Sequence, residues 1–476
     1  MSRTIFHAAL ALTIAAIGAL AVPAASFAFL VGAEANGELI NSDRTPEQQA
    51  FALDKLKAQG VQIVRANISW RETAANCAGE TALALQEHTN PCYSWGVIDN
   101  LVRLSTERKI QLLVSSSRVP AWLHPGQEDP YFVGSFTVDF DKTNEHYAAF
   151  VRAAASRYKA GSEYGTIQRW TIWNEPNSVT FWKPTPNATR YAQMYGKAAV
   201  ALKTGNPAAL IAPGPTGPNS TIKPVPFIAA FQAQVVKFLP KVNARKYINA
   251  WAHNPYPNNF SPNGHAKTKR SYATATSLGM AETPKLIALL DAKPITKKLP
   301  IWGTEFGWET KPDDPRPVWA RQSVTRVLQA QYLADGFAYL ARNPRMALGI
   351  YYGLTDNTNY EGDWQSGTFG ANGIAKPSHY SYQRMVSTGG ATGRKQQVIK
   401  LWGRSTIAPT KGQLVYRTAP TGLWKVVPMQ KRSFDGSINA NFKLTATKTW
   451  FAVRDNQKTA ATKFQLVGPA QVVSAR

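Results

Sequence analysis

Short apolar runs rich in β-branched and aromatic residues alternate with longer amphipathic stretches from residue 27 onward. This alternation is typical of βα units that build a parallel sheet. Eight runs predict strands, at 27–32, 61–68, 110–115, 168–173, 209–212, 247–252, 299–304 and 347–352. Eight βα units predict an α/β fold over residues 29–388, a (β/α)8 TIM barrel.

The first predicted helix has clear boundary signals. Thr45, Pro46 and Gln48 predict an N-cap, a first-turn proline and the partner of a capping box, and Gly60 predicts the end of the helix. A doubly wound sheet is the competing fold. Residues 32–37, after the first strand, lack the glycine spacing of a phosphate-binding loop and do not lead directly into a helix. The barrel is therefore favoured.

The pattern changes after about Ser387. Residues 389–393 are rich in glycine and predict a linker, and short alternating runs separated by Gly, Pro and Asp turns follow it. Four of these runs predict strands, at 413–416, 424–427, 440–444 and 450–454. Residues 394–476 therefore predict a small C-terminal all-β sandwich-like module.

The N-terminal residues 1–28 have the pattern of a secretory signal peptide. Arg3 supplies a positive charge, residues 5–22 are apolar and rich in alanine, and small residues before Ala25 and Ala28 offer cleavage sites. A membrane anchor is the weaker alternative, because the segment is short for a span of ~20 residues and no second one follows. We expect a secreted or cell-envelope protein without a transmembrane segment after cleavage.

The chain contains two cysteines, Cys77 and Cys92, in a polar stretch between two predicted core elements. In an oxidising compartment two cysteines this close in sequence favour a disulfide. A metal site is the alternative, but two thiols without a His or Cys at finger-like spacing form a poor zinc ligand set. The pair is therefore interpreted as a disulfide.

The charge is strongly unbalanced, with 54 Lys and Arg against 29 Asp and Glu and a formal net charge of +25. Such a field favours polyanions, although a basic composition can also be a general property of an exported protein. From residue 390 onward there are 15 Lys and Arg against Asp435 and Asp455, a net +13. This predicts an anionic polymer or cell surface as a partner of the C-terminal module, with a solvated cationic face as the alternative.

Two glutamates follow predicted strands directly. The fourth strand leads into Glu175 and the seventh into Glu305. In a TIM barrel the active site lies at the carboxyl ends of the strands, so both carboxyl groups are expected on the reacting face. Hydrolysis of a glycosidic bond needs one carboxyl group to protonate the leaving oxygen and another to attack or stabilise the oxocarbenium-like centre.

The neighbouring residues strengthen this interpretation. Asn174 can hydrogen-bond a sugar hydroxyl, and Trp173, Trp302 and Trp308 offer apolar faces for sugar rings. No clustered His, Asp and Glu set at metal-ligand spacing is present in the sequence, and the chemistry requires no metal or cofactor.

Residues 173–177 (Trp-Asn-Glu-Pro-Asn) and 304–308 (Thr-Glu-Phe-Gly-Trp) resemble the two signatures of the retaining glycoside hydrolases of clan A, which include families five, ten and thirty-nine. The resemblance covers residues 29–386. It implies a (β/α)8 enzyme that cleaves β-glycosidic bonds by double displacement, with Glu175 as acid/base and Glu305 as nucleophile, and the signal-peptide pattern predicts that this enzyme is secreted.

Other positions resemble the clan in part. Arg65 resembles the buried arginine that supports the ionised nucleophile, and His253 and Tyr256 resemble the clan's His/Tyr region, with a structural histidine as the alternative for His253. Trp122 is either a sugar platform or loop packing. The end of the eighth strand departs from the pattern, because Tyr352 stands in a region where many members place a tryptophan.

The substrate is expected to be a β-linked polysaccharide or oligosaccharide, and nucleic acid is not expected as a partner. The alternative function is a non-catalytic carbohydrate-binding or anionic-polymer-binding protein of the cell envelope. That alternative leaves the two glutamate motifs unexplained.

Overall fold

The computed structural model describes residues 28–134, 140–257, 274–310, 323–357, 364–433, 435–455 and 467–475. The predicted signal peptide lies outside the described residues, apart from Ala28. Within the described ranges, no helix combines the length and the apolar character that a membrane crossing requires.

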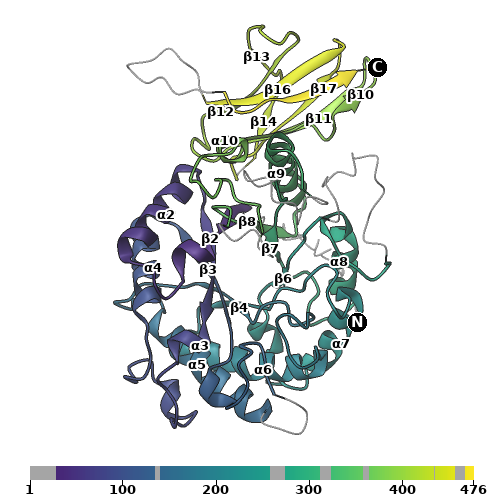
Figure 1. The fold of residues 1–476 in the computed structure, drawn as a ribbon. Helices are drawn as coiled ribbons and strands as arrows, with labels where there is room; N and C mark the ends of the chain where they lie inside the picture. The colour runs from purple at the N-terminus through teal and green to yellow at the C-terminus, as the bar shows by residue number, and fades with distance from the viewer. Residues whose placement is uncertain are drawn as a thin grey trace, which may run out of the picture.

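A parallel sheet of eight strands forms the centre of the larger part of the molecule (Figure 1). Its strands run in the order β5-β4-β3-β2-β1-β8-β7-β6, so the first and last strands are neighbours. A bridge between Thr216 and His253 joins the ends of the order, next to β5 and β6. The strands are β1 (Leu30–Glu34), β2 (Ile63–Ser69), β3 (Gln111–Ser117), β4 (Arg169–Ile172), β5 (Leu210–Pro213), β6 (Trp251–His253), β7 (Ile301–Phe306) and β8 (Met346–Tyr352). The predicted TIM barrel is confirmed.

All eight predicted runs coincide with strands, and the largest boundary error is at β6. The run was expected to begin at residue 247, but Ala244–Tyr247 form a 3-10 turn instead. Asn243 precedes this turn in the left-handed conformation, with φ 58°, which asparagine adopts more readily than most residues. The strand begins only at Trp251.

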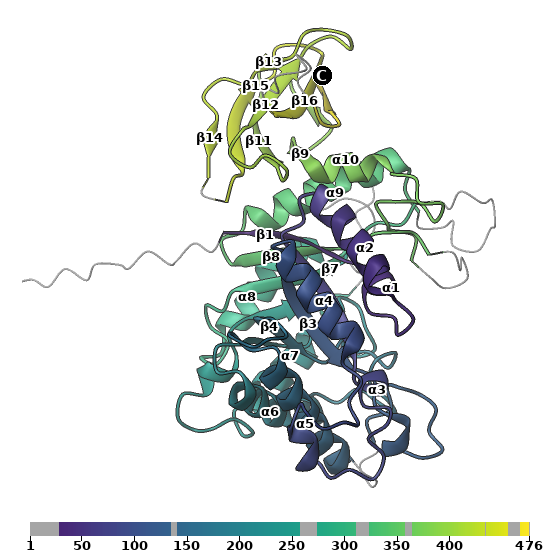
Figure 2. The same ribbon diagram turned by 90° about the vertical axis from the view of Figure 1, so that its left-hand side faces the viewer.

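Helices surround the strands in both views of the molecule (Figures 1 and 2). The α-helices are α1 (Asn36–Leu39), α2 (Pro46–Ala58), α3 (Trp70–Thr73), α4 (Gly96–Glu107), α5 (Phe140–Arg157), α6 (Ala188–Gly205), α7 (Pro224–Val235), α8 (Thr283–Asp291), α9 (Arg326–Ala341) and α10 (Pro377–Gln383). The predicted capping box of α2 is present, since Gln48 N donates to Thr45 Oγ1 at 3.3 Å and Thr45 N donates to Gln48 Oε1 at 3.1 Å. Gly60 follows this helix with φ 79°.

Apolar side chains fill two layers of the barrel. One layer lies between the strands and the helices, and a smaller one fills the barrel interior, where Trp302, Leu113 and Ile350 pack together. The interior is therefore a packed core, and the carboxyl ends of the strands are left to form a site.

The C-terminal module consists of two sheets packed on a shared apolar core, and their strands pair antiparallel except for β10 and β17, which are parallel. Figure 2 shows it next to α9 and α10. One sheet has the order β10-β17-β16-β12-β13 and the other β14-β15-β11-β9. The strands are β9 (Arg384–Ser387), β10 (Thr392–Gly393), β11 (Val398–Ser405), β12 (Gly412–Arg417), β13 (Lys425–Val426), β14 (Lys431–Arg432), β15 (Ile438–Lys443), β16 (Lys448–Asp455) and β17 (Gln471–Ala475). The module therefore begins at β9, before the glycine-rich segment, and part of that segment forms β10.

Polar contacts join the module to the start of the barrel. Arg404 is buried, its Nη1 donates to the carbonyl oxygen of Phe29 at 3.0 Å, and its Nη2 donates to Gln62 Oε1 at 3.0 Å. On the barrel side, the Tyr382 hydroxyl donates to the carbonyl oxygen of Gly32. The last part of the chain thus holds the first strand of the barrel.

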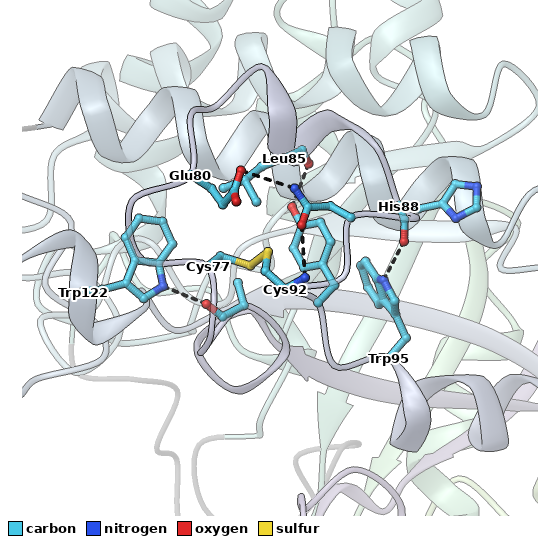
Figure 3. Close-up of a disulfide and its surroundings, with 10 residues drawn as sticks. Cys77, Glu80, Leu85, His88, Cys92, Trp95 and Trp122 are labelled. Atoms are coloured by element: carbon cyan, nitrogen blue, oxygen red, sulfur yellow. Dashed lines mark hydrogen bonds between the residues drawn. A yellow bond between two sulfur atoms is a disulfide. The ribbon is translucent and has the colours of Figure 1, made fainter.

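The disulfide between Cys77 and Cys92 is present, with the two Cα atoms 4.9 Å apart (Figure 3). It closes the excursion between α3 and α4. Aromatic side chains surround it, and the Trp122 indole donates to the carbonyl oxygen of Ala74 at 2.7 Å. The Trp95 indole donates to the carbonyl oxygen of His88 at 3.0 Å.

We expect a Cys77→Ser/Cys92→Ser double variant to fold but to be less stable. Closure of a loop with a sequence separation of 15 is worth roughly 3 kcal/mol in the chain-entropy model. Urea unfolding under oxidising conditions measures the loss. Wild-type protein under reducing conditions should lose the same amount, and equal stability of the variant and the oxidised wild type would contradict the expectation.

Candidate active site

Glu305 lies near the end of β7 and is held by one side chain from β2 and one from the segment after β6. The Arg65 guanidinium of β2 donates to Glu305 Oε1 through Nη1, and the Tyr256 hydroxyl donates to Glu305 Oε2 at 3.1 Å. Arg65 is fully buried, while the Glu305 side chain is 11% exposed. The carboxylate is therefore fixed by two donors, and a small part of its surface remains accessible.

Arg65 organises several groups beneath the site. Its Nη2 donates to Asn174 Oδ1 at 2.8 Å and to Ser115 Oγ at 3.3 Å. Its Nη1 also donates to Glu34 Oε2 at 2.7 Å. The guanidinium thus joins the ends of β1, β2, β3, β4 and β7, because it presents several fixed donors in one plane.

Glu34 is a third buried carboxyl group of the site. It ends β1, is 2% exposed, and accepts a hydrogen bond from Asn36 Nδ2 as well as from Arg65. Burial raises the pKa of Glu34 to about 8, against the opposing attraction of Arg65 and with added repulsion from Glu305. Because Glu34 is largely protonated at neutral pH, the positive charge of Arg65 is balanced mainly by Glu305.

Glu175 follows β4 in an unusual backbone conformation. Its φ is 36° and that of Trp173 is 69°, both in the left-handed region that non-glycine residues rarely adopt. Gly217 lies beside the Glu175 carboxyl group, and a Cβ atom built on it would be only 2.6 Å from Glu175 Oε2. A larger residue at position 217 would therefore displace the Glu175 carboxyl group or the Ser220 hydroxyl.

The Glu175 carboxyl group is half-buried and bonded on one side. Asn254, just after β6, donates from Nδ2 to Glu175 Oε1 at 2.7 Å, and Thr304 Oγ1 donates to Asn254 Oδ1 at 2.8 Å. Desolvation, together with repulsion from the Glu305 charge and against the Asn254 hydrogen bond, raises the pKa of Glu175 to about 7. Glu175 thus has the protonation behaviour of a general acid near neutral pH.

His253 has a structural role. It is 2% exposed, and its Nδ1 and Nε2 are paired with Thr216 Oγ1 at 2.8 Å and the carbonyl oxygen of Leu278 at 2.7 Å. Burial lowers its pKa to about 4, so the ring is neutral at pH 7. The structure favours the structural alternative for His253 over substrate binding, because both ring nitrogens are paired with protein groups.

Three aromatic side chains gather on the open side of Glu305. The Tyr256 ring lies 5.1 Å from the ring of Trp364 and 6.5 Å from that of Tyr352, measured between centroids. Trp364 is 47% exposed. Tyr352 thus lies near the active site, as the sequence predicted, and the Trp364 ring lies beside it.

The other tryptophans do not lie at the site surface. Trp173 is fully buried against Tyr147 and Trp182, and Trp302 fills the barrel interior. Trp308 is 4% exposed and packs on Phe306 and Tyr332. These three tryptophans were expected to offer faces for sugar rings, but the structure places them in the core. Trp122 packs beside the disulfide loop, which supports the loop-packing alternative (Figure 3).

The family model for glycosyl hydrolases family 39 matches residues 59–391. The chain belongs to glycosyl hydrolase family 39. The resemblance to the glycoside hydrolases of clan A is thereby confirmed.

Solved structures share the fold of this family 39 hydrolase. A family 39 glycoside hydrolase from Bacteroides cellulosilyticus WH2 superposes with a TM-score of 0.53 and 15% identity, over 88% of this chain and 80% of that one. A family 39 enzyme from Xanthomonas axonopodis pv. citri gives a TM-score of 0.52 and 16% identity, over 88% and 92%.

Among curated proteins, a β-xylosidase from Geobacillus stearothermophilus is 30% identical over 120 residues. The match covers 25% of this chain and 23% of the xylosidase. The chain thus aligns with about a quarter of that relative's length.

Three residues of the family 39 site were not singled out from the sequence: Glu34, Asn254 and Trp364. Glu34 follows an apolar run as Glu175 and Glu305 do, so its position at a strand end was a usable signal. Asn254 is next to His253, and only the structure shows which of the two faces Glu175. In the described part of the chain, no group of three or more His, Cys, Asp and Glu side chains could hold a metal ion.

Proposed function

We propose that this family 39 enzyme is a retaining β-glycosidase in which Glu305 is the nucleophile and Glu175 the acid/base. The observation that carries the proposal is the asymmetry of the two carboxyl groups. Glu305 contacts the cationic Arg65 and the Tyr256 hydroxyl, whereas Glu175 has a raised pKa and is bonded to the neutral Asn254. Such a division supplies one ionised and one protonated carboxyl group, as the reaction requires.

The steps follow from this arrangement. Glu305 attacks the anomeric carbon while Glu175 gives its proton to the departing glycosidic oxygen, which yields a covalent glycosyl-enzyme. Glu175, now a carboxylate, takes a proton from water, and the water oxygen attacks the anomeric carbon and releases Glu305. Asn174 accepts from Arg65 through its side-chain oxygen, so its amide group is oriented to donate to a sugar hydroxyl.

The substrate is proposed to be a β-linked oligosaccharide or polysaccharide outside the cytoplasm. The signal-peptide pattern of residues 1–28 and the disulfide both support export. β-Xylosides are the first substrates to test because the curated relative is a β-xylosidase.

Proton NMR of the first product formed from aryl β-xyloside, β-glucoside and acidic β-linked oligosaccharides tests the function. The proposal expects the β-anomer first, followed by slow mutarotation. Initial formation of the α-anomer would indicate inversion. Binding without hydrolysis of any substrate would favour the non-catalytic carbohydrate-binding alternative.

The pH dependence of kcat/KM should have an alkaline limb set by Glu175. Activity falls as the pH rises through about 7, because the acid form of Glu175 is lost. Since the Asn254 hydrogen bond lowers the pKa of Glu175, an Asn254→Ala variant should move this limb to higher pH. A limb that stays in place or moves to lower pH in the variant would contradict the assignment.

We also propose that the cationic edges of the C-terminal module bind an anionic polysaccharide. β13 and β14 are edge strands of the two sheets and present Lys425, Lys431 and Arg432, all exposed. Nearby, the Arg417 guanidinium lies 4.6 Å from the centre of the Trp424 ring. Cations beside an aromatic face suit a polyanion made of sugar rings.

A Lys425→Gln/Lys431→Gln variant should elute from immobilised alginate at a lower salt concentration than the wild type. The matched control is Lys237→Gln/Lys241→Gln, which removes two exposed lysines from the barrel. Equal shifts for the two variants would show that retention follows the net charge, and the module would then have no specific surface.

A further inference from the structure

A pocket of about 350 Å³ opens beside the active site, at the carboxyl ends of β1 and β8. It shares Glu34 and Tyr352 with the site, but its lining does not include Glu175 or Glu305. Its volume is at the lower end of the range for ligand pockets, ~300–1,000 Å³. The proposed mechanism assigns no role to this space.

One wall of the pocket is the Trp364 indole. With 47% of its surface exposed, it is a large aromatic side chain that the core does not use. Contacts with Tyr256 and Tyr352, at centroid distances of 5.1 and 6.3 Å, hold the ring at the boundary between the pocket and the active site. A ring in this position offers an apolar face on which a sugar ring can stack.

The lining also includes polar side chains from the segment after β1. Glu38 Oε1 accepts from the backbone nitrogen of Thr355 at 3.2 Å, and Arg44 Nε donates to the carbonyl oxygen of Gly37 at 2.8 Å. These bonds fix both side chains in the lining of the pocket. An acceptor and a set of donors in the same pocket as an aromatic face are suited to sugar hydroxyl groups.

The place of the pocket in the barrel determines which part of a substrate can reach it. β8 and β4 lie on opposite sides of an eight-stranded barrel with this strand order. Glu175, after β4, protonates the leaving oxygen, so the leaving group lies on the β4 side. The reacting sugar then extends away from the leaving group, toward β8 and β1.

We infer that this pocket binds a second glycosyl unit, joined to the non-reducing side of the sugar that Glu305 attacks. The natural substrate then has at least two glycosyl units on that side of the cleaved bond. Trp364 stacks on the second unit, while Glu38 and Arg44 bind its hydroxyl groups. The inference rests on the proposed function, because the direction of the substrate follows from Glu175 as the acid.

Matched 4-nitrophenyl glycosides test the inference, namely the β-xyloside against the β-xylobioside and the β-glucoside against the β-cellobioside. The measured quantity is the ratio of kcat/KM for the disaccharide to that for the monosaccharide with release of the same nitrophenolate. The wild-type ratio should exceed one, and Trp364→Ala should lower it at least ~10-fold, as expected for the loss of a buried aromatic contact. Glu38→Gln should lower it less.

The control is Tyr380→Ala, which removes an aromatic side chain that is 52% exposed on α10, outside the pocket. Its ratio should equal that of the wild type. The inference is overturned if the wild type does not prefer the disaccharides, or if Trp364→Ala lowers both kcat/KM values equally. Hydrolysis of neither pair, and of none of the acidic β-linked oligosaccharides, by the wild type would instead refute the proposed function, and the inference would fail with it.

Discussion

A Glu305→Gln variant should lose at least ~10⁴-fold in kcat, which corresponds to about 5.4 kcal/mol of transition-state stabilisation. The amide is close in size to the carboxyl group, but it cannot form the glycosyl ester. Arg65 can still donate to the amide oxygen in the position of Oε1, and the amide NH2 in the position of Oε2 can donate to the oxygen of the Tyr256 hydroxyl. The loss should therefore be in chemistry and not in folding.

The measurement combines aryl glycoside turnover with thermal unfolding. Glu309→Gln is the matched control, because Glu309 lies four residues further along and bonds the backbone nitrogen of Gln365 outside the catalytic pair. A 2-deoxy-2-fluoro glycoside should label the wild type on the peptide that contains Glu305 and leave Glu305→Gln unlabelled. Near wild-type turnover by Glu305→Gln, or a label on another peptide, would exclude Glu305 as the nucleophile.

A Glu175→Ala variant should show a loss that depends on the leaving group. For alcohols that need a proton to depart, kcat/KM should fall by ~10²–10⁴-fold, the usual contribution of a general acid. For 2,4-dinitrophenolate, which departs without a proton, the first step should change little. Hydrolysis of the intermediate then becomes slow, because the base that activates water is missing.

Azide distinguishes this role from a structural one. As an anion that needs no general base, it should restore turnover of the dinitrophenyl glycoside by Glu175→Ala and give a β-glycosyl azide. Asn177→Ala is the comparison, since Asn177 holds the same segment through the backbone of Gly217 and Ile222. An equal loss for all leaving groups, without azide rescue, would show that Glu175 only supports the fold of this segment.

The sequence was sufficient to predict the barrel because its evidence is local. Buried parallel strands appear as apolar runs, and Thr45, Gln48 and Gly60 mark the ends of their helix by short-range hydrogen bonds and backbone conformation. The two glutamates were found for the same reason, since a strand end in a barrel is a position in space as well as in sequence.

Side-chain direction was harder to predict. Trp173, Trp302 and Trp308 lie within three residues of a glutamate in sequence, but side-chain direction at a strand end depends on the local backbone, such as the φ of 69° at Trp173, and the three rings lie in the core. Trp364 is distant from both motifs and reaches the site through the segment after β8. Its role depends on which loops meet at the barrel opening, and short-range patterns do not contain that information.

The first strand of the barrel receives two of its hydrogen-bond donors, from Arg404 and Tyr382, only late in synthesis of the chain. The carbonyl oxygens of Phe29 and Gly32 receive their donors from residues 375 and 350 positions further along. At ~5–20 residues per second, translation delivers these donors roughly 20–75 s after the first strand. Until β8 is made, one edge of β1 is unpaired and can pair with other chains. A chain truncated before Arg404 contains β8 but lacks the Arg404 donor to the carbonyl oxygen of Phe29, so nonsense mutations in the module should destabilise the first strand of the catalytic barrel.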